Sequence, residues 1–266
     1  MAGPGQLRGP DDGGAGDRPV GPTAIEHATA LALLGEGELD VVGRLVASSN
    51  RALYCSITRH CPDPEPDVVA ACVYKPIRGE RPLDDFPDGT LGYREVATHT
   101  VSEASGWRIV PPTILRDGPF GPGMVQLWID TDDDIDPWEL VQRSDPSLRR
   151  MAVFDAIVNN ADRKVGHILP VAGGHLYGVD HGICFATEPK LRTVLWAWRG
   201  RRLGDDELEV LERLRAEVRG ALGEELGTLL SRREVAAVGR RIDELLRTRR
   251  FPQPDPDRPA IPWPPF

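Results

Sequence analysis

Several residues with chemically useful side chains stand close together between Asn159 and Phe185, in NNADRKVGHILPVAGGHLYGVDHGICF. Asp162 lies in a polar turn after a helical pattern, where a carboxylate can accept a proton from an attacking hydroxyl. Lys164 follows two residues later, close enough to steady a transferring phosphoryl group. Asp180 precedes Gly182 at a strand end, and its hard carboxylate oxygens suit magnesium. The purely structural alternative is an Asx-rich turn that links a helix to a strand.

A second candidate pair lies earlier in the chain. Lys75 is one of only three lysines, and arginine supplies all the other basic side chains. Arginine can replace a surface lysine at little cost, but not a lysine whose compact ammonium is needed. Lys75 ends the apolar run 68–77, which predicts a central strand, and there it can neutralise a phosphate. Glu95 follows in a helical pattern and can pair with Lys75. The alternatives are a surface lysine with a packed stem and an exposed helix glutamate.

The elements that position these residues follow from periodicity and from Gly and Pro breakers. Residues 1–22 are rich in Gly, Pro and Asp, which predicts disorder. The range 23–130 predicts a helix, about five strands and a further helix after the third strand, which makes a sheet-rich N-lobe. The range 131–250 predicts a mainly helical C-lobe that contains the catalytic loop and a hairpin. The Pro-dense tail, residues 251–266, favours polyproline II structure. The fold class is therefore α+β.

Composition and charge exclude several classes of function. The formal net charge is −9 and the pI is about 5.2, so a bulk attraction to nucleic acid or to anionic lipid is not expected. No apolar run approaches the roughly 20 residues of a membrane helix, and the first residues lack the apolar core of a signal peptide. The four cysteines form no C-x-x-C pair and are interpreted as reduced packing thiols. We expect a cytoplasmic protein without stable membrane association.

The order of the chemical residues is that of a kinase: a strand-end lysine, a helix glutamate, a loop aspartate with a lysine two positions later, and an aspartate before x-Gly. The segments VYKP, YREVATHTVSEASGWRIVPPT, VFDAIVNNADRKVGH and YGVDHGICF resemble the phosphatidylinositol 3-/4-kinase-like family, above all its compact bacterial branch and the type II phosphatidylinositol 4-kinases. The resemblance covers roughly residues 40–200. It implies a two-lobed protein-kinase-like fold with an antiparallel-sheet N-lobe and a mainly helical C-lobe.

The resemblance also implies a role for each candidate residue. Lys75 holds the α- and β-phosphates of ATP and is braced by Glu95. Asp162 is the base or the carboxylate that orients the acceptor, and Asp180 holds the metal. Two further segments surround the nucleotide, a hinge beside adenine and a turn over the phosphates: Gln126, Leu127 and Trp128 for the hinge, and Ser48, Ser49 and Asn50 for the turn.

The chain departs from the family pattern D-R-x-x-x-N and D-x-G at one metal ligand. His167 stands where the family has the metal-binding Asn, five residues after Asp162. A neutral imidazole is a softer ligand than an amide oxygen and suits manganese better than magnesium. The phosphate-covering turn also has no glycine.

We expect an ATP-dependent phosphotransferase that uses Mg or Mn. The alternatives are a nucleotide-binding pseudokinase or regulatory module, and a metal-dependent phosphohydrolase in which His167 and His181 join the two aspartates.

The acceptor is not defined by the sequence. A basic and aromatic stretch follows the D-x-G motif, where kinase-like folds bind acceptors; it contains Arg192, Arg199, Arg201, Arg202, Trp196 and Trp198. It can bind an acidic or phosphorylated molecule or a peptide. The alternative is that the tryptophans pack inward and the arginines are solvated. Because the chain is acidic and has no expected membrane anchor, a protein or small-molecule acceptor is favoured over a phosphoinositide.

Overall fold

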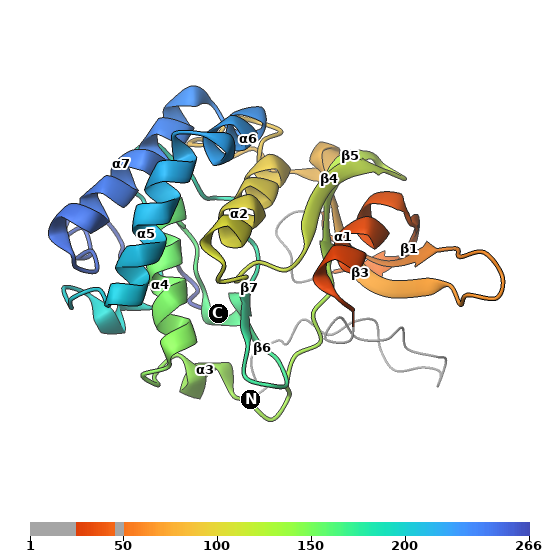
Figure 1. Ribbon diagram of the computed structural model, residues 1–266, viewed down its shortest axis with the longest axis horizontal. Helices are drawn as coiled ribbons and strands as arrows, with labels where there is room; N and C mark the ends of the chain where they lie inside the picture. Colours follow the sequence, from red (N-terminus) through yellow and green to blue (C-terminus); the bar gives the residue numbers. More distant parts are fainter. Residues whose placement is uncertain (1–24, 46–50) are drawn as a thin grey trace. The chain divides into compact units, whose positions relative to one another are not determined.

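A computed structural model describes residues 25–45 and 51–266, which fall into two compact units (Figure 1). Unit 1 contains the described residues up to Gly92 and the segment Pro111–Thr131. Unit 2 contains Tyr93–Val110 and Asp132–Phe266. The expected disordered segment, 1–22, lies outside the described residues.

Unit 1 is built on an antiparallel sheet with the strand order β1-β2-β3-β5-β4. Its elements are α1 (His27–Glu36), β1 (Glu38–Arg44), β2 (Leu53–Arg59), β3 (Val68–Pro76), the short helix η2 (Ile77–Gly79), β4 (Thr113–Gly118) and β5 (Gly121–Leu127). Buried and partly buried residues alternate along β2, as expected for a strand with one face on a core. β3 is apolar almost throughout, in agreement with its predicted central position.

Helix α1 covers one face of this sheet. Its buried Leu33 and Leu34 pack with inward-facing residues of β2, β3 and β5, including Cys55, Tyr74 and Val125. Arg116 of β4 binds the C-terminal end of this helix, because its Nη1 donates to the carbonyls of Leu34 (2.7 Å) and Gly37 (2.8 Å). These carbonyls belong to the end of α1, where the helix itself provides no partner.

Unit 2 is mainly helical, with one two-stranded antiparallel ribbon, β6-β7. Its elements are α2 (Leu91–Ser105), whose first two residues belong to unit 1, α3 (Pro137–Leu140), α4 (Pro146–Val158), η3 (Val165–His167), β6 (Ile168–Pro170), β7 (Leu176–Gly178), η4 (Trp196–Trp198), α5 (Asp205–Val218), α6 (Ala221–Leu229) and α7 (Arg232–Thr248). Helix α7 packs against both α4 and α5 (Figure 1). An antiparallel-sheet unit and a helical unit confirm the predicted α+β fold class.

Local sequence explains where α4 begins and ends. Asp145 caps its start by accepting from the backbone N–H of Ser147 (2.7 Å) and Leu148 (3.3 Å), and Pro146 occupies the first turn. All residues from Met151 to Val158 are buried, so this helix is the centre of the unit 2 core. The helix ends at Asn159, which adopts the left-handed conformation (φ 54°). The helix predicted for 146–161 therefore stops before the candidate catalytic loop around Asp162.

The boundary between the units differs from the sequence-based one at residues 93–110. The sequence places this segment in the sheet-rich range 23–130, whereas in the structure it groups with the helical unit. The reason is packing: Ala97, Val101 and Ile109 are buried in the core of unit 2. Helix α2 thus belongs mostly to the unit that carries the candidate catalytic loop.

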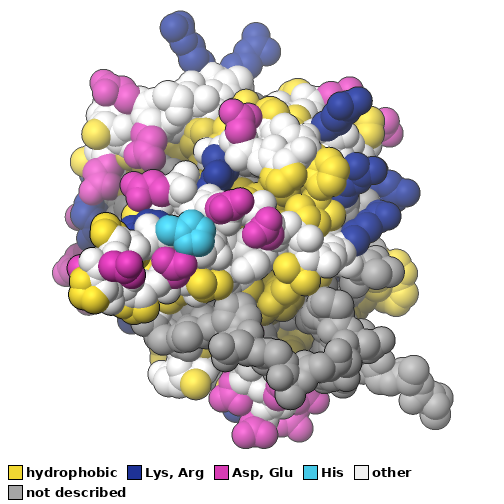
Figure 2. All heavy atoms as spheres, turned by 90° about the vertical axis from the view of Figure 1, so that its right-hand side faces the viewer, with side chains coloured by type: hydrophobic (Ala, Val, Ile, Leu, Met, Phe, Trp, Pro, Cys, Tyr) yellow, Lys and Arg dark blue, Asp and Glu magenta, His cyan; other side chains and the backbone are white. Residues whose placement is uncertain are grey.

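The whole sequence has a formal net charge of −9. Figure 2 shows acidic side chains gathered around a histidine on one face. In unit 1 the exposed His60 pairs with Asp67 (Nδ1 to Oδ2, 2.7 Å), which raises the pKa of His60. Among the helices of the described residues, none has both the length and the apolar character that crossing a bilayer requires.

Candidate functional site

The candidate catalytic loop of unit 2 begins at Asn159, whose side chain forms three hydrogen bonds. Its Nδ2 donates to the carbonyls of Ala186 (2.9 Å) and Glu188 (2.7 Å), and its Oδ1 accepts from the N–H of Lys190 (2.9 Å). Asn160 holds the next turn, because its Oδ1 accepts from the N–H of Asp162 at 2.9 Å. Asn159 therefore fixes the loop to the segment that follows Asp180, and Asn160 holds the turn that contains Asp162.

Asp162 and Lys164 form an ion pair in this loop. The distance from Lys164 Nζ to Asp162 Oδ2 is 3.3 Å, and about a fifth of each side chain is exposed (20% and 21%). Burial raises the pKa of Asp162 above its ordinary value; nearby Asp180 adds to the rise, and Lys164 and Arg192 oppose it in part. A partly buried carboxylate with a raised pKa is a better proton acceptor than an exposed one.

His167 connects Asp162 to Asp180. Its Nδ1 lies 2.9 Å from the carbonyl oxygen of Asp162, and its Nε2 lies 3.5 Å from Asp180 Oδ2. Because a carbonyl oxygen only accepts, Nδ1 carries the hydrogen, and in a neutral ring Nε2 has a lone pair facing a carboxylate. A proton or a cation at this position removes the repulsion between the two. An imidazole nitrogen and a carboxylate oxygen fit a divalent metal such as Mn²⁺ or Mg²⁺.

The backbone of Asp180 has an unusual conformation. Its φ is 60°, in the left-handed region that few residues other than glycine adopt. The next residue, His181, is fixed by Glu95 of α2, whose Oε2 accepts from the N–H of His181 at 3.1 Å. Glu95 is buried (2% exposed). The sequence predicts a pair of Glu95 with Lys75; the bond to His181 is a role of Glu95 that the sequence did not suggest, and the pair with Lys75 stays a prediction.

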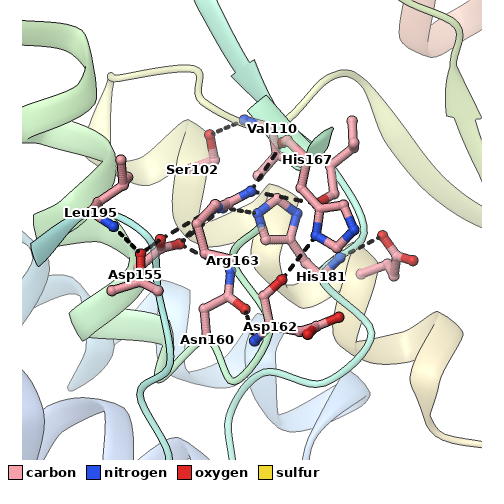
Figure 3. A network of polar contacts seen from close by, with 12 residues as sticks. Ser102, Val110, Asp155, Asn160, Asp162, Arg163, His167, His181 and Leu195 are labelled. Atoms are coloured by element: carbon pink, nitrogen blue, oxygen red, sulfur yellow. Dashed lines mark hydrogen bonds and ion pairs between the residues drawn. The ribbon is translucent and has the colours of Figure 1, made fainter. Parts of the chain in front are cut away.

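A buried ionic network lies beneath the two aspartates (Figure 3). Arg163, 0% exposed, forms an ion pair with Asp155 of α4, which is also 0% exposed, with a shortest distance of 2.9 Å. The same guanidinium contacts His181 Nε2 at 2.6 Å and donates to the carbonyls of His167 (3.2 Å) and Val179 (3.4 Å). Arg163 thus joins α4, the catalytic loop and the segment around Asp180.

The sequence reasoning missed this network. The sequence did contain a sign of a buried ion pair at Asp155, because this charged residue stands in the middle of an otherwise apolar stretch, MAVFDAIV. A carboxylate on the buried side of a helix needs a partner, and arginine is the usual one. Arg163, the arginine of the D-R motif, directly follows Asp162 in the sequence and was a possible partner for Asp155. The sequence suggests a role for His181 only in the phosphohydrolase alternative, and the structure buries His181 completely.

The nucleotide-side candidates lie in unit 1. Lys75 of β3 pairs in register with Met124 of β5 and is partly buried, on the face of the sheet opposite α1. In the expected hinge, Gln126 is buried and donates to Thr113 Oγ1 (2.8 Å). The N–H groups of Leu127 and Trp128 donate to the carbonyls of Pro112 (2.9 Å) and Ala71 (3.0 Å). Both amides are therefore used inside the unit. Ser48, Ser49 and Asn50 lie outside the described residues.

The basic and aromatic stretch adopts the packed alternative. Trp196 and Trp198 are buried, whereas Arg199, Arg201 and Arg202 are exposed. Arg192 differs from these three, because its Nε donates to the carbonyl of Ala161 (2.7 Å), next to Asp162. Of the arginines in this stretch, Arg192 is thus the one that the structure places beside the catalytic loop.

The fold resembles that of solved kinases. The Golgi casein kinase has a TM-score of 0.52 and 14% identity, with 84% of this chain and 75% of that chain covered. The structure of hydra Fam20 with sugar has a TM-score of 0.52 and 13% identity, with 85% and 89% covered. The protein therefore has a two-lobed, kinase-like α+β fold.

One curated relative defines the family. Protein Rv2133c of Mycobacterium tuberculosis is 41% identical over 276 residues, which include 91% of this chain and 95% of the relative. The chain belongs to the same family as this mycobacterial protein. No family model matches the chain.

Proposed function

We propose that this protein is an ATP-dependent phosphotransferase that transfers the γ-phosphate to a hydroxyl acceptor, as a relative of the phosphatidylinositol 3-/4-kinase-like family. The observation that carries the proposal is the link between the two aspartates in unit 2. Asp162, paired with Lys164, is connected through the His167 ring to Asp180, with 2.9 Å on one side and 3.5 Å on the other. This arrangement combines a base with a raised pKa and a candidate metal pair.

The proposed reaction assigns one task to each residue. The acceptor oxygen attacks the γ-phosphorus, the bond to the β,γ-bridging oxygen breaks, and ADP leaves. Asp162 takes the proton of the acceptor hydroxyl, and Lys164 stabilises the negative charge on the transferred phosphoryl group. Asp180 and His167 would hold Mg²⁺ or Mn²⁺, which neutralises phosphate charge when bound.

The nucleotide contacts complete the proposal. Lys75 holds the α- and β-phosphates, and Glu95 supports Lys75. Adenine lies beside the hinge Gln126–Trp128, where the amides of Leu127 and Trp128 are used within the unit. Ser48, Ser49 and Asn50, which lie outside the described residues, are the sequence-based candidates for the turn over the phosphates. The acceptor is a protein or a small molecule, and Lys164 and Arg192 next to Asp162 favour an anionic one.

Two assays test the proposal. Transfer of labelled γ-phosphate is measured with Mg and with Mn for the wild type and for Asp162→Asn, which should reduce transfer at least 100-fold, as expected for loss of a general base (~10²–10⁴). ATP-induced stabilisation is measured by thermal shift for the wild type and for Lys75→Ala, with Arg78→Ala as the control. Arg78 is exposed and only three residues from Lys75. Absence of an ATP-dependent shift in the wild type excludes the phosphotransferase.

The structure bears differently on the two alternatives. A pseudokinase remains the second candidate, because His167 replaces the metal-binding Asn of the family; it is established if the wild type binds ATP but never turns it over with either metal. The phosphohydrolase alternative needed His181 as a metal ligand. His181 is fully buried and its Nε2 contacts the Arg163 guanidinium at 2.6 Å, which argues against ligation through that atom.

A further inference from the structure

The Pro-rich tail, residues 251–266, packs along unit 2 beside the catalytic loop. The carbonyl of Pro265 accepts from the N–H of Val165 at 2.8 Å. The carbonyl of Ala260 accepts from the N–H of Thr193 (3.1 Å) and from the indole N–H of Trp196 (2.8 Å). The tail thus contacts two segments that are separate in sequence, one on each side of the D-x-G motif.

The ring of Phe266 lies against the turn that follows Lys164. It stacks on Trp138, with ring centroids 5.9 Å apart and an interplanar angle of 20°. The ring also lies beside Gly166, because a Cβ added to this glycine would be 3.4 Å from the nearest ring carbon, in ordinary van der Waals contact. The Phe266 ring therefore contacts the turn at Gly166.

This turn carries two residues of the candidate site. The 3₁₀ helix η3 runs from Val165 to His167, directly after Lys164. Val165 is completely buried, and its N–H is the group held by Pro265. A one-turn helix has few internal hydrogen bonds, so its position depends on outside contacts. The hydrogen bond from Val165 to Pro265 of the tail is such an outside contact.

The second contact of the tail supports the same loop from the other side. Thr193 forms a parallel bridge with Arg163, through Arg163 N–H to Arg192 O (3.1 Å) and Val194 N–H to Arg163 O (3.1 Å). The Thr193 hydroxyl also lies 3.3 Å from Asp155 Oδ2, in the buried network. Ala260 is therefore hydrogen-bonded to Thr193, which in turn pairs with Arg163, the residue after Asp162.

We propose that the Pro-rich tail, through Pro265 and Phe266, positions Lys164 and His167 for phosphoryl transfer. The inference rests on the proposed function. Phe266 is a positioning residue, since its ring touches the backbone of Gly166 rather than the reacting groups. Loss of the ring should loosen the turn, and displacement of a reacting group by about 1 Å can cost roughly 100-fold in rate. Nucleotide affinity should change little, because Lys75 and the expected hinge lie in unit 1.

The test compares Phe266→Ala, the conservative Phe266→Tyr and the control Ile261→Ala. Ile261 is a large apolar residue on the same tail, but it is half exposed (49%). Phe266→Ala should lower kcat about 10-fold or more while KM for ATP stays within about 2-fold; Phe266→Tyr should restore kcat, and Ile261→Ala should leave it unchanged. A rise in turnover for Phe266→Ala would identify the tail as an inhibitory segment and overturn the inference.

A second measurement separates this inference from the proposed function. Hydrogen exchange of the amides of residues 164–168 should become faster in Phe266→Ala and remain unchanged in Ile261→Ala, whether or not the wild type transfers phosphate. If the wild type is inactive, the proposed function fails and the exchange data alone decide whether the tail holds the turn. Unchanged exchange in Phe266→Ala refutes the positioning role.

Discussion

Arg163 Nη2 and His181 Nε2 lie 2.6 Å apart, and each residue directly follows one of the two candidate acids, Asp162 and Asp180 (Figure 3). A guanidinium only donates, so His181 Nε2 is the acceptor, and a neutral His181 ring carries its hydrogen on Nδ1. Both side chains are completely buried. The residues that follow the two acids in the chain thus hold the two acids in relation to each other.

Removal of the guanidinium should destabilise unit 2 strongly. Arg163→Met leaves Asp155 buried without its counter-charge, and loss of one partner of a buried pair costs about 3–5 kcal/mol. Chemical denaturation of the variant measures this loss. The double variant Asp155→Leu/Arg163→Met should lose less than the sum of the two single variants, because it leaves no unpaired charge.

The matched control for this experiment is Arg201→Met, which changes an exposed arginine of the same unit. Its free energy of unfolding should stay within about 0.5 kcal/mol of the wild type. A loss below about 1 kcal/mol for Arg163→Met would mean that Asp155 is hydrated or protonated rather than paired.

Gly178 of β7 provides room for the same guanidinium. A Cβ at this position would lie 2.9 Å from both Nη1 and Nη2 of Arg163. The tip of an arginine usually moves aside easily, but here Asp155, His181 and two carbonyls hold it. Gly178→Ala should therefore cost about 1–3 kcal/mol of stability through overpacking and should also reduce phosphate transfer.

Gly227→Ala is the control for Gly178→Ala. Gly227 lies in α6, and an added Cβ would meet no atom within 4 Å. Alanine is favoured over glycine inside a helix, so this variant should gain about 0.5–1 kcal/mol. Equal stability changes for the two variants, measured in the same urea titrations, would contradict the steric explanation.

Periodicity and local chemistry were enough to predict the elements. The apolar run 68–77 became β3, and the helical patterns at 93–106 and 203–248 became α2 and the helices α5 to α7. The kinase-like order of Lys75, Asp162 and Asp180 follows from spacing along the chain, which a sequence shows directly. Element types and the kinase-like fold were therefore predictable.

Contacts between distant residues were not predictable. The pairing of Arg163 with His181 depends on how a loop and a hairpin meet, and both residues have ordinary alternatives in a sequence. The tail shows the same limit: Pro265 contacts Val165, a residue one hundred positions earlier. Composition predicts that a Pro-dense segment is extended, but not the surface on which it lies.

The choice of metal should depend on His167. His167→Asn replaces an imidazole nitrogen with a hard amide oxygen, while the Asn amide can still donate to the Asp162 carbonyl. The ratio of Mg-supported to Mn-supported phosphate transfer should rise several-fold, which a metal titration at saturating ATP measures. His175→Asn, in the hairpin between β6 and β7, is the control and should leave the ratio unchanged. An unchanged ratio for His167→Asn would exclude His167 as a metal ligand.

Glu234 should make the stability of unit 2 depend on pH. Its carboxylate closes the capping box of α7 with Ser231 and pairs with the buried Arg94 (Nη2 to Oε1, 2.5 Å). Burial pushes the pKa of Glu234 upward, but the hydrogen bonds from Ser231 and Arg94 outweigh this effect and lower it below its ordinary value. A depressed pKa in the folded state stabilises the fold above the unfolded pKa, about 4.3 for glutamate, and this contribution is lost as the pH falls through the folded value.

Glu234→Gln should therefore lose about 1–3 kcal/mol at pH 7, and its difference from the wild type should shrink as the pH falls below about 4. Urea unfolding of both proteins at a series of pH values measures this difference. Glu209→Gln, an exposed glutamate on α5, is the matched control and should show a small difference that does not vary with pH. If the loss for Glu234→Gln stays constant from pH 7 to pH 3, the charge of Glu234 contributes nothing, and the residue acts only through the shape of its side chain.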